Sequence, residues 1–161
     1  MTRTESLRKS FLVDEKGRLI AKQGSMHRPL GSVVGSLNKK SGYVQFNLNN
    51  KLEYAHRVVF EIIHGYAPSR VDHINGDKSD NRPCNLRECS SSQNIWNTGL
   101  PSTNTSGAKN VHWLPRKRLW QVNIKAHGKY VFRKKFKSFE DAVLASVNQR
   151  LIWHGEFANH G

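Results

Sequence analysis

At 161 residues the chain is long enough for one domain of usual size or for two small ones. Its 26 Lys and Arg residues against 12 Asp and Glu residues give a formal net charge of +14, which favours a polyanionic partner, nucleic acid first. No apolar run approaches the ~18 residues that span a membrane, and the N-terminus lacks the apolar core of a signal peptide, so we expect a cytoplasmic protein with no membrane partner.

The N-terminal part predicts two β-hairpins followed by a short helix. Apolar segments on either side of a Gly-containing turn predict a first hairpin over residues 11–21, and the Gly, Ser and Lys residues of 24–40 predict a loop. Alternating apolar residues and an Asn-Asn turn predict a second hairpin over 43–56. Apolar residues then recur at helical spacing over 57–64, and Gly65 is a natural C-terminal cap, so we expect a short helix that packs on this hairpin.

Residues 70–98 contain polar residues in an unusual order. They predict a short strand, a tight turn at Asn75-Gly76, a polar loop, a second short strand near 85–88, and a helix that the serines at 90–92 can cap. The most informative polar residues are, in order, Asp72-His73, Asp80-Asn81-Arg82, Asn85-Leu86, Gln93-Asn94 and Asn97. Through these residues the stretch resembles the HNH nucleases, in the branch in which Asn replaces the last His of the motif.

The resemblance implies two strands and a helix around one divalent metal ion. Phosphodiester hydrolysis needs a deprotonated water and positive charge on the phosphate, and a neutral imidazole together with a hard cation supplies both. We therefore expect His73 to be the general base, and Asp72 and Asn94 to hold Mg²⁺ or Mn²⁺. The resemblance assigns Asn85 to fixing the backbone that bears His73, and Asn97, one helical turn after Asn94, to a supporting or phosphate contact.

Two further observations qualify this metal site. Adjacent residues of a regular strand point to opposite faces, so Asp72 and His73 can share a metal site only where the strand is distorted or the metal lies at its edge. The two cysteines, Cys84 and Cys89, have no second pair to complete a zinc site, so no structural zinc is expected. Taken singly, each motif residue also fits turn chemistry or a solvated helix face, and the ordered set favours the nuclease.

Arg57 precedes the motif. The His56-Arg57 pair resembles the segment that commonly precedes the motif in this nuclease branch. Arg57 fits a phosphate contact and a solvated helix start about equally well.

The C-terminal part predicts a different unit. Small polar residues at 101–107 predict a linker, segments at 111–114, 119–126 and 130–136 predict three strands, and 138–154 predicts a helix. Residues 116–137 contain nine basic residues and no acidic one. The middle strand divides into an apolar face of Trp120, Val122 and Ile124 and a polar face of Gln121, Asn123 and Lys125.

If the apolar face packs on the helix, the polar face is open and strongly basic, and a three-stranded sheet is slim enough to enter the major groove. This half resembles an AP2-type DNA-binding domain through residues 120–125 and 136–142. The alternative is a basic face that only solubilises the chain. The expected DNA contacts are the turn cations Arg116, Lys117 and Arg118, the strand residues Gln121, Asn123 and Lys125, and Arg133 and Lys135 on the following strand.

We therefore predict an α+β protein of two modules. Residues 1–100 form an HNH nuclease domain, with its motif core at 70–98, in which hairpins and a short helix precede a ββα-metal unit. Residues 101–107 form the linker, and residues 108–161 form an AP2-like domain of a three-stranded antiparallel sheet plus a helix. The arrangement resembles the homing endonucleases of phages and introns, which implies a metal-dependent, site-directed enzyme that nicks double-stranded DNA in the bacterial host cytoplasm.

Two other functions fit the same sequence. One is a sequence-specific DNA-binding regulator with an inactive nuclease unit, and the other is RNA binding or cleavage, for which no aromatic platform of the single-strand kind is visible. A single catalytic motif makes one strand cut per visit, so a monomer that nicks and a dimer that makes a double-strand break both fit.

Overall fold

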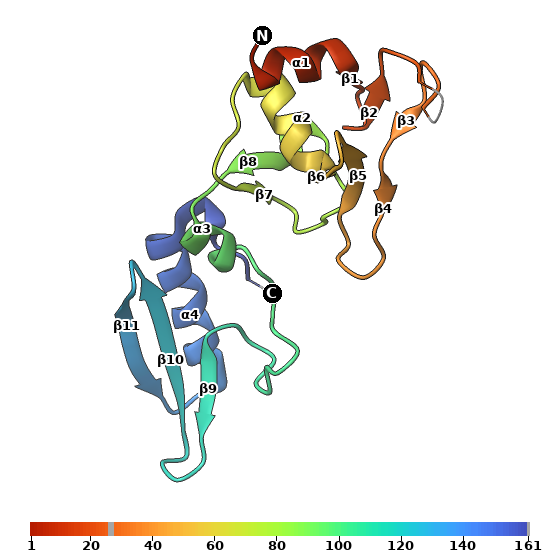
Figure 1. Cartoon of the computed structure of the whole chain (residues 1–161). Coiled ribbons are helices and arrows are strands. Elements are labelled where there is room, and N and C mark those ends of the chain that lie inside the picture. The colour runs from red at the N-terminus through yellow and green to blue at the C-terminus, as the bar shows by residue number, and fades with distance from the viewer. Residues whose placement is uncertain (26–27, 161) are drawn as a thin grey trace. The chain divides into compact units, whose positions relative to one another are not determined.

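The computed structural model describes residues 1–25 and 28–160 (Figure 1). Contacts between Cα atoms divide the chain into two compact units, Met1–Ser90 and Ser91–Gly161. This division falls ten residues before the predicted end of the nuclease domain at residue 100, so the helix α3 (Ser91–Trp96) is counted with the second unit. No helix among the described residues is long and apolar enough to cross a membrane.

Three small antiparallel sheets and two helices build the first unit. Its sheets have the strand orders β1-β2-β3, β4-β5-β6 and β7-β8. The elements are α1 (Arg3–Ser10), β1 (Phe11–Val13), β2 (Leu19–Ala21), β3 (Val33–Val34), β4 (Ser36–Leu37), β5 (Val44–Leu48), β6 (Lys51–Tyr54), α2 (Ala55–His64), β7 (Val71–His73), a 3-10 helix (Pro83–Asn85) and β8 (Leu86–Glu88).

Both predicted hairpins and the helix after them are confirmed, as β1-β2, β5-β6 and α2. The prediction of a loop over 24–40 is wrong at 33–37, where β3 and β4 pair with β2 and β5. These strands are two residues long, too short for an alternating pattern to show in the sequence. Helix α2 begins at Ala55, so the return strand of the second hairpin ends at Tyr54.

Helix α1 was not among the predicted elements. A capping box starts it, in which the Thr2 side chain accepts from the Glu5 amide and the Glu5 carboxylate accepts from the Thr2 amide. Leu7 is its one buried side chain, so it lacks the repeated apolar positions that reveal a helix in a sequence. Arg3 fastens α1 to the rest of the unit through ion pairs of 3.0 Å with Glu53 and with Glu61.

The second unit is a three-stranded antiparallel sheet with one long helix, as predicted. Its elements are α3, β9 (Val111–Leu114), β10 (Leu119–Ala126), β11 (Lys129–Phe136), α4 (Phe139–His154) and a 3-10 helix (Gly155–Phe157). The sheet order is β11-β10-β9. Val122 and Ile124 are fully buried with Val111 and Ala142, which confirms that the apolar face of β10 packs on α4.

The helical spacing of Ala142, Ala145, Gln149 and Ile152 predicts that they share the buried face of α4, and of these only Ala142 is fully buried. The buried residues are spaced by four: Ala142, Ser146, Arg150 and His154. Three of them are polar and their side chains donate to carbonyls, with Ser146 and Arg150 bonded to Lys109 O at 2.6 and 2.9 Å. Hydropathy cannot identify this stripe, because its polar members can be buried only where hydrogen bonds satisfy them. The apolar Ile152, in contrast, is 68% exposed.

Candidate functional site

The strand pair β7-β8 places the two central residues of the motif. Its register sets Asp72 opposite Arg87 and His73 opposite Leu86. Both Asp72 and His73 are buried, although they flank a polar loop, because β7 packs under α2. Burial of two ionisable residues in a three-residue strand requires that each has a polar partner.

The side chain of Asn85 makes hydrogen bonds to two other residues of the loop between β7 and β8. Its Nδ2 donates to Asn75 Oδ1 at 3.0 Å and to the Asp80 carbonyl at 2.8 Å, while its Oδ1 accepts from the Asn75 amide at 3.0 Å. The Asp80 carboxylate in turn accepts from Arg82, whose hydrogen bonds lower the pKa of Asp80 to about 2. Asn85 therefore holds the turn that directly follows His73.

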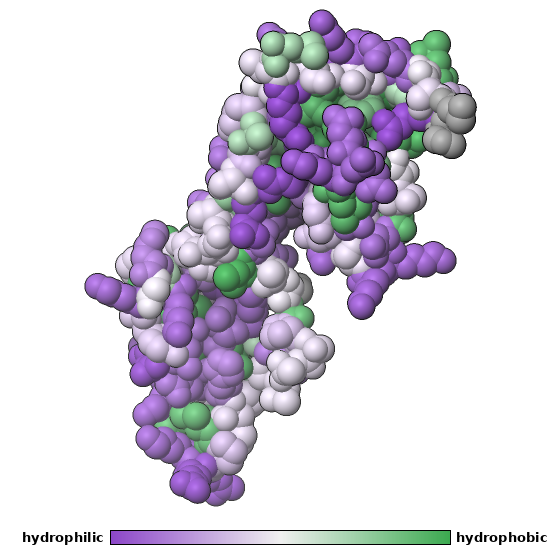
Figure 2. Space-filling model, in the orientation of Figure 1, coloured by the Kyte–Doolittle hydropathy of each residue, from purple (hydrophilic) through white to green (hydrophobic). Residues whose placement is uncertain are grey.

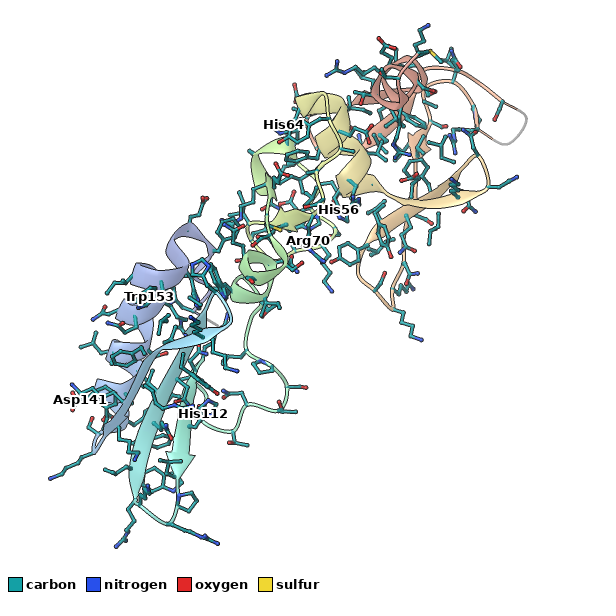
Figure 3. The ribbon with its side chains drawn as sticks, turned by 60° about the vertical axis from the view of Figure 1, so that its left-hand side comes forward. His56, His64, Arg70, His112, Asp141 and Trp153 are labelled. Carbon is teal, nitrogen blue, oxygen red and sulfur yellow. The ribbon has the colours of Figure 1, made fainter. Side chains whose placement is uncertain are left out.

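His73 is enclosed by an amide and two rings. Its Nε2 lies 3.0 Å from Asn81 Oδ1, and both residues are buried, at 4% and 5% exposure. The ring of His56 lies 4.9 Å from that of His73, and the ring of Tyr43 lies 6.0 Å away. Burial, with the neighbouring His73 as a smaller cause, lowers the pKa of His56 to about 3. Figure 3 shows His56 at the start of α2.

Asp72 points to a different partner. Its Oδ2 accepts from Arg87 Nε at 3.0 Å and lies 2.9 Å from Nη2, across the strand pair. Asp72 thus faces Arg87 while His73 faces Asn81, as the alternation of a regular strand requires. The side chains of Asp72 and Arg87 are only 7% and 12% exposed, so this ion pair is largely removed from water.

Asp72 is the one carboxylate among the predicted metal ligands. No group of three or more His, Cys, Asp or Glu side chains in residues 1–25 and 28–160 is placed to hold a metal ion. Mg²⁺ commonly takes one or two carboxylates and completes its shell with water and substrate phosphate. Asp72 supplies one carboxylate, and its Oδ2 is paired with Arg87 Nη2 at 2.9 Å.

The remaining predicted residues near the motif lie in three settings. Arg57 donates to the carbonyls of Pro68 and Ser69 at 3.0 and 3.1 Å, so its guanidinium fastens the segment that leads into β7. Asn94 is half-buried on α3, and Asn97 is buried directly after α3. Both belong to the second unit and Asp72 to the first, so the ligand pair Asp72 and Asn94 stays a prediction.

The polar face of the sheet gathers the predicted DNA-binding residues. Register sets Gln121 opposite Lys135 and Asn123 opposite Arg133, and Gln121 Nε2 donates to Asn123 Oδ1 at 3.0 Å. The surface over β9, β10 and β11 is mostly hydrophilic in the view of Figure 2. At one end of the face a hollow of about 880 Å³ is lined by Leu114, Pro115, Arg116, Lys117, Gln121, Arg133, Lys134 and Lys135.

Cations lie close to one another on this face. Lys117 lies close enough to Lys135 to lower the pKa of that ammonium. Further along the face, Arg133 and Lys125 lie 3.9 and 4.5 Å from the centre of the Tyr130 ring and lower the pKa of its hydroxyl. Arg118 is exposed in the β9-β10 turn with φ +52°. Like charges held together in this way favour an anionic ligand.

Three residues near His73 were not identified as site residues from the sequence. Asn81 lies within the Asp-Asn-Arg run of the motif, and His56 lies in the pair that precedes the motif. Both residues contribute to the resemblance, but the sequence assigns neither of them a function. Tyr43 had no signal, because it begins a strand segment 30 residues before His73. Only the folded chain brings its ring to the site.

Comparison with known proteins identifies the same region. A family model described as HNH endonuclease matches residues 53–95, which include β7, β8 and the loop between them. Protein 3.8 of Escherichia phage T7 is 31% identical over 122 residues, which cover 74% of this chain and 97% of that protein. No solved structure gives a significant match.

Proposed function

This chain belongs to the same family as the phage T7 protein and contains an HNH endonuclease domain, and we propose that it is a metal-dependent, site-directed endonuclease that cuts double-stranded DNA. The observation that carries the proposal is the buried His73, whose Nε2 is hydrogen-bonded to Asn81 and which directly follows the buried Asp72 in β7. All three residues lie within the segment that matches the nuclease family.

The chemistry follows from these side chains. His73 accepts a proton from a water molecule, and the resulting hydroxide attacks the phosphorus in line with the 3′ oxygen, which leaves. Asp72 and Asn94 are the residues that hold Mg²⁺ or Mn²⁺, which supplies positive charge to the phosphate when bound. Asn85 contributes indirectly, because its three hydrogen bonds fix the turn that follows His73.

The sheet of the second unit is the proposed DNA reader, in an AP2-like role. Its polar face presents amides on β10 beside cations on β11 and on the β9-β10 turn. Amides of Gln and Asn pair with adenine in the major groove, and the flanking cations bind phosphates. Asn97 and Arg57 complete the proposed DNA contacts, although the guanidinium of Arg57 already donates to two backbone carbonyls.

The proposed role is of the homing type, because the combination of one nuclease motif with one DNA reader resembles the arrangement in homing endonucleases. One active site cuts one strand per visit, so the expected product is a nick. The protein acts as a monomer in this account, and a double-strand break requires a dimer or two visits. The phage origin of the relative supports action in the cytoplasm of a bacterial host.

Cleavage of supercoiled plasmid tests the proposal. The full chain is incubated with plasmid and Mg²⁺ or Mn²⁺, with EDTA as the control, and nicked and linear products are resolved on a gel. We expect nicking that needs the metal. Added as competitors, duplex DNA should inhibit nicking of the plasmid more strongly than RNA does. Binding without cutting on several DNAs, including the source genome, would support a regulator instead.

A further inference from the structure

We propose that Asn81 is a positioning residue that sets the tautomer of His73, so that Nδ1 is the nitrogen that takes the proton from water. The inference rests on the proposed role of His73 as general base. It assigns a function to a residue that the sequence pattern only marked, and it names the atom of His73 that reacts.

The hydrogen bond determines where the imidazole proton lies. Asn81 Oδ1 is 3.0 Å from His73 Nε2, and an amide oxygen can only accept a hydrogen bond. In neutral imidazole one ring nitrogen carries the hydrogen and the other carries the lone pair. Nε2 must therefore be the donor, which leaves the lone pair on Nδ1.

Burial makes this preference strong. Asn81 and His73 are 5% and 4% exposed, so water competes little for the hydrogen bond between Nε2 and Oδ1. With the Asn81 amide oriented as it is, the opposite tautomer would point the lone pair of Nε2 at the lone pairs of Oδ1, and neither atom would have a hydrogen to share. The ring cannot easily turn away, because the rings of His56 and Tyr43 lie 4.9 and 6.0 Å from it.

The backbone of Asn81 is held by the N-terminal hairpin. Gly17, in the turn between β1 and β2, approaches this backbone so closely that a Cβ atom would lie 2.1 Å from Asn81 C and O. The Gly17 amide donates to the Asp14 carbonyl at 2.9 Å, which closes the turn. An element more than 50 residues before the motif therefore fixes the position from which Asn81 reaches His73.

Nuclear magnetic resonance of the imidazole nitrogens tests the tautomer directly. The full chain is labelled with ¹⁵N-histidine and measured without DNA at a pH well above about 6.5, with the His73 signals assigned by their loss in His73→Ala. We expect hydrogen on Nε2 of His73 in the wild type and in Asn81→Asp, which keeps an acceptor oxygen. In Asn81→Ala we expect the Nδ1–H form to appear.

Cleavage kinetics test whether the tautomer matters. Asn81→Ala is expected to slow cleavage of saturating plasmid about 10- to 100-fold without changing the affinity for DNA. The matched control is Asn47→Ala, at an exposed asparagine on β5, which should change neither the tautomer nor the rate.

Several outcomes would overturn the proposal. Hydrogen on Nδ1 of His73 in the wild type would overturn it, even if Asn81→Ala failed to fold. In a folded Asn81→Ala, an unchanged tautomer or an unchanged cleavage rate would also overturn it. If the wild type cuts no DNA but the tautomer still shifts in Asn81→Ala, the proposed function fails while the assignment of the tautomer holds.

Discussion

His56 and His73 lie next to each other in the first unit, with ring centres 4.9 Å apart. His56 is buried against Tyr43, with ring centres 5.1 Å apart, and its Nδ1 has no hydrogen-bond partner among the described residues. Burial lowers its pKa to about 3, so His56 stays neutral at any pH near 7. It therefore forms an uncharged wall beside the proposed general base.

The lowered pKa of His56 predicts a loss of stability in mild acid. The folded pKa of about 3 lies below the unfolded value of 6.5, so between these values the unfolded chain binds a proton that the folded chain does not. The contribution of neutral His56 to the free energy of unfolding is fully present above pH 6.5 and is lost as pH falls towards 3. At pH 5 the free energy of unfolding should have fallen by about 2 kcal/mol on this account.

Urea unfolding at pH 7 and pH 5 measures this loss. All four tryptophans, at 96, 113, 120 and 153, lie in the second unit, so circular dichroism and not tryptophan fluorescence should follow the first unit. His56→Phe should remove most of the acid sensitivity, whereas His64→Phe, at an exposed position of the same helix, should keep it. An equal loss in the wild type and in His56→Phe would contradict the account.

The sequence predicts the central residues of the proposed site, but it does not predict their partners in the fold. Asp72, His73, Asn85 and Asn94 follow each other in an order that itself indicates the chemistry. The contacts of His73 with Asn81 and Tyr43 depend on how a loop and a distant strand fold back. No local pattern encodes such contacts, because they are made across 8 and 30 residues of chain.

At the scale of elements, the turn between β1 and β2 supports the nuclease motif. Gly17 has φ +72° and touches the Asn81 backbone, so Gly17→Ala adds both backbone strain and a collision. We expect a loss of about 2–4 kcal/mol in the free energy of unfolding and slower cleavage. Gly31→Ala is the matched control, because φ is +78° there and nothing lies within 4 Å of the added Cβ.

Comparing the two variants separates strain from collision. Both share the backbone penalty, so the difference between their unfolding free energies in urea reports the contact of Gly17 with Asn81. Equal destabilisation and equal cleavage rates in the two variants would show that the hairpin does not support the motif.

The elements that the sequence predicted well are those with regular apolar spacing. The hairpins, α2 and the three strands of the second unit all alternate or repeat in hydropathy, and all are present. The sequence does not predict helix α1 or the polar members of the buried stripe of α4, because polar interactions position them. The capping box of Thr2 and the bonds of Ser146 and Arg150 to the Lys109 carbonyl leave no apolar period in the sequence.

At the scale of the whole molecule, both predicted domains carry excess positive charge. Residues 1–100 have 15 basic and 9 acidic residues, and residues 101–161 have 11 and 3, which gives +6 and +8. Each cation that binds a phosphate releases counterions, so affinity for DNA should fall steeply with salt. The net charge of each domain can be counted from the sequence. The proximity of Lys117 to Lys135 cannot be predicted from it, because it depends on the register of the sheet.

The salt dependence of binding tests the sheet as a DNA surface. Changing both Lys117 and Lys135 to Gln should weaken binding to all sequences and reduce the slope of log K against log salt by about 1–2. Lys9→Gln with Lys16→Gln, at two exposed lysines of the first unit, makes the same change in net charge. Equal slopes for the two double variants would show that the effect is one of net charge and not of this face.

His73→Ala tests the central claim most directly, that His73 is the general base of a DNA-cutting site. Cleavage of supercoiled plasmid and affinity for the same DNA are measured on one preparation, with the exposed His64→Ala as the control. We predict that His73→Ala slows cleavage by at least about 10²-fold while its Kd for DNA stays that of the wild type. Cleavage that persists in His73→Ala, or that falls only in step with binding, would contradict this role.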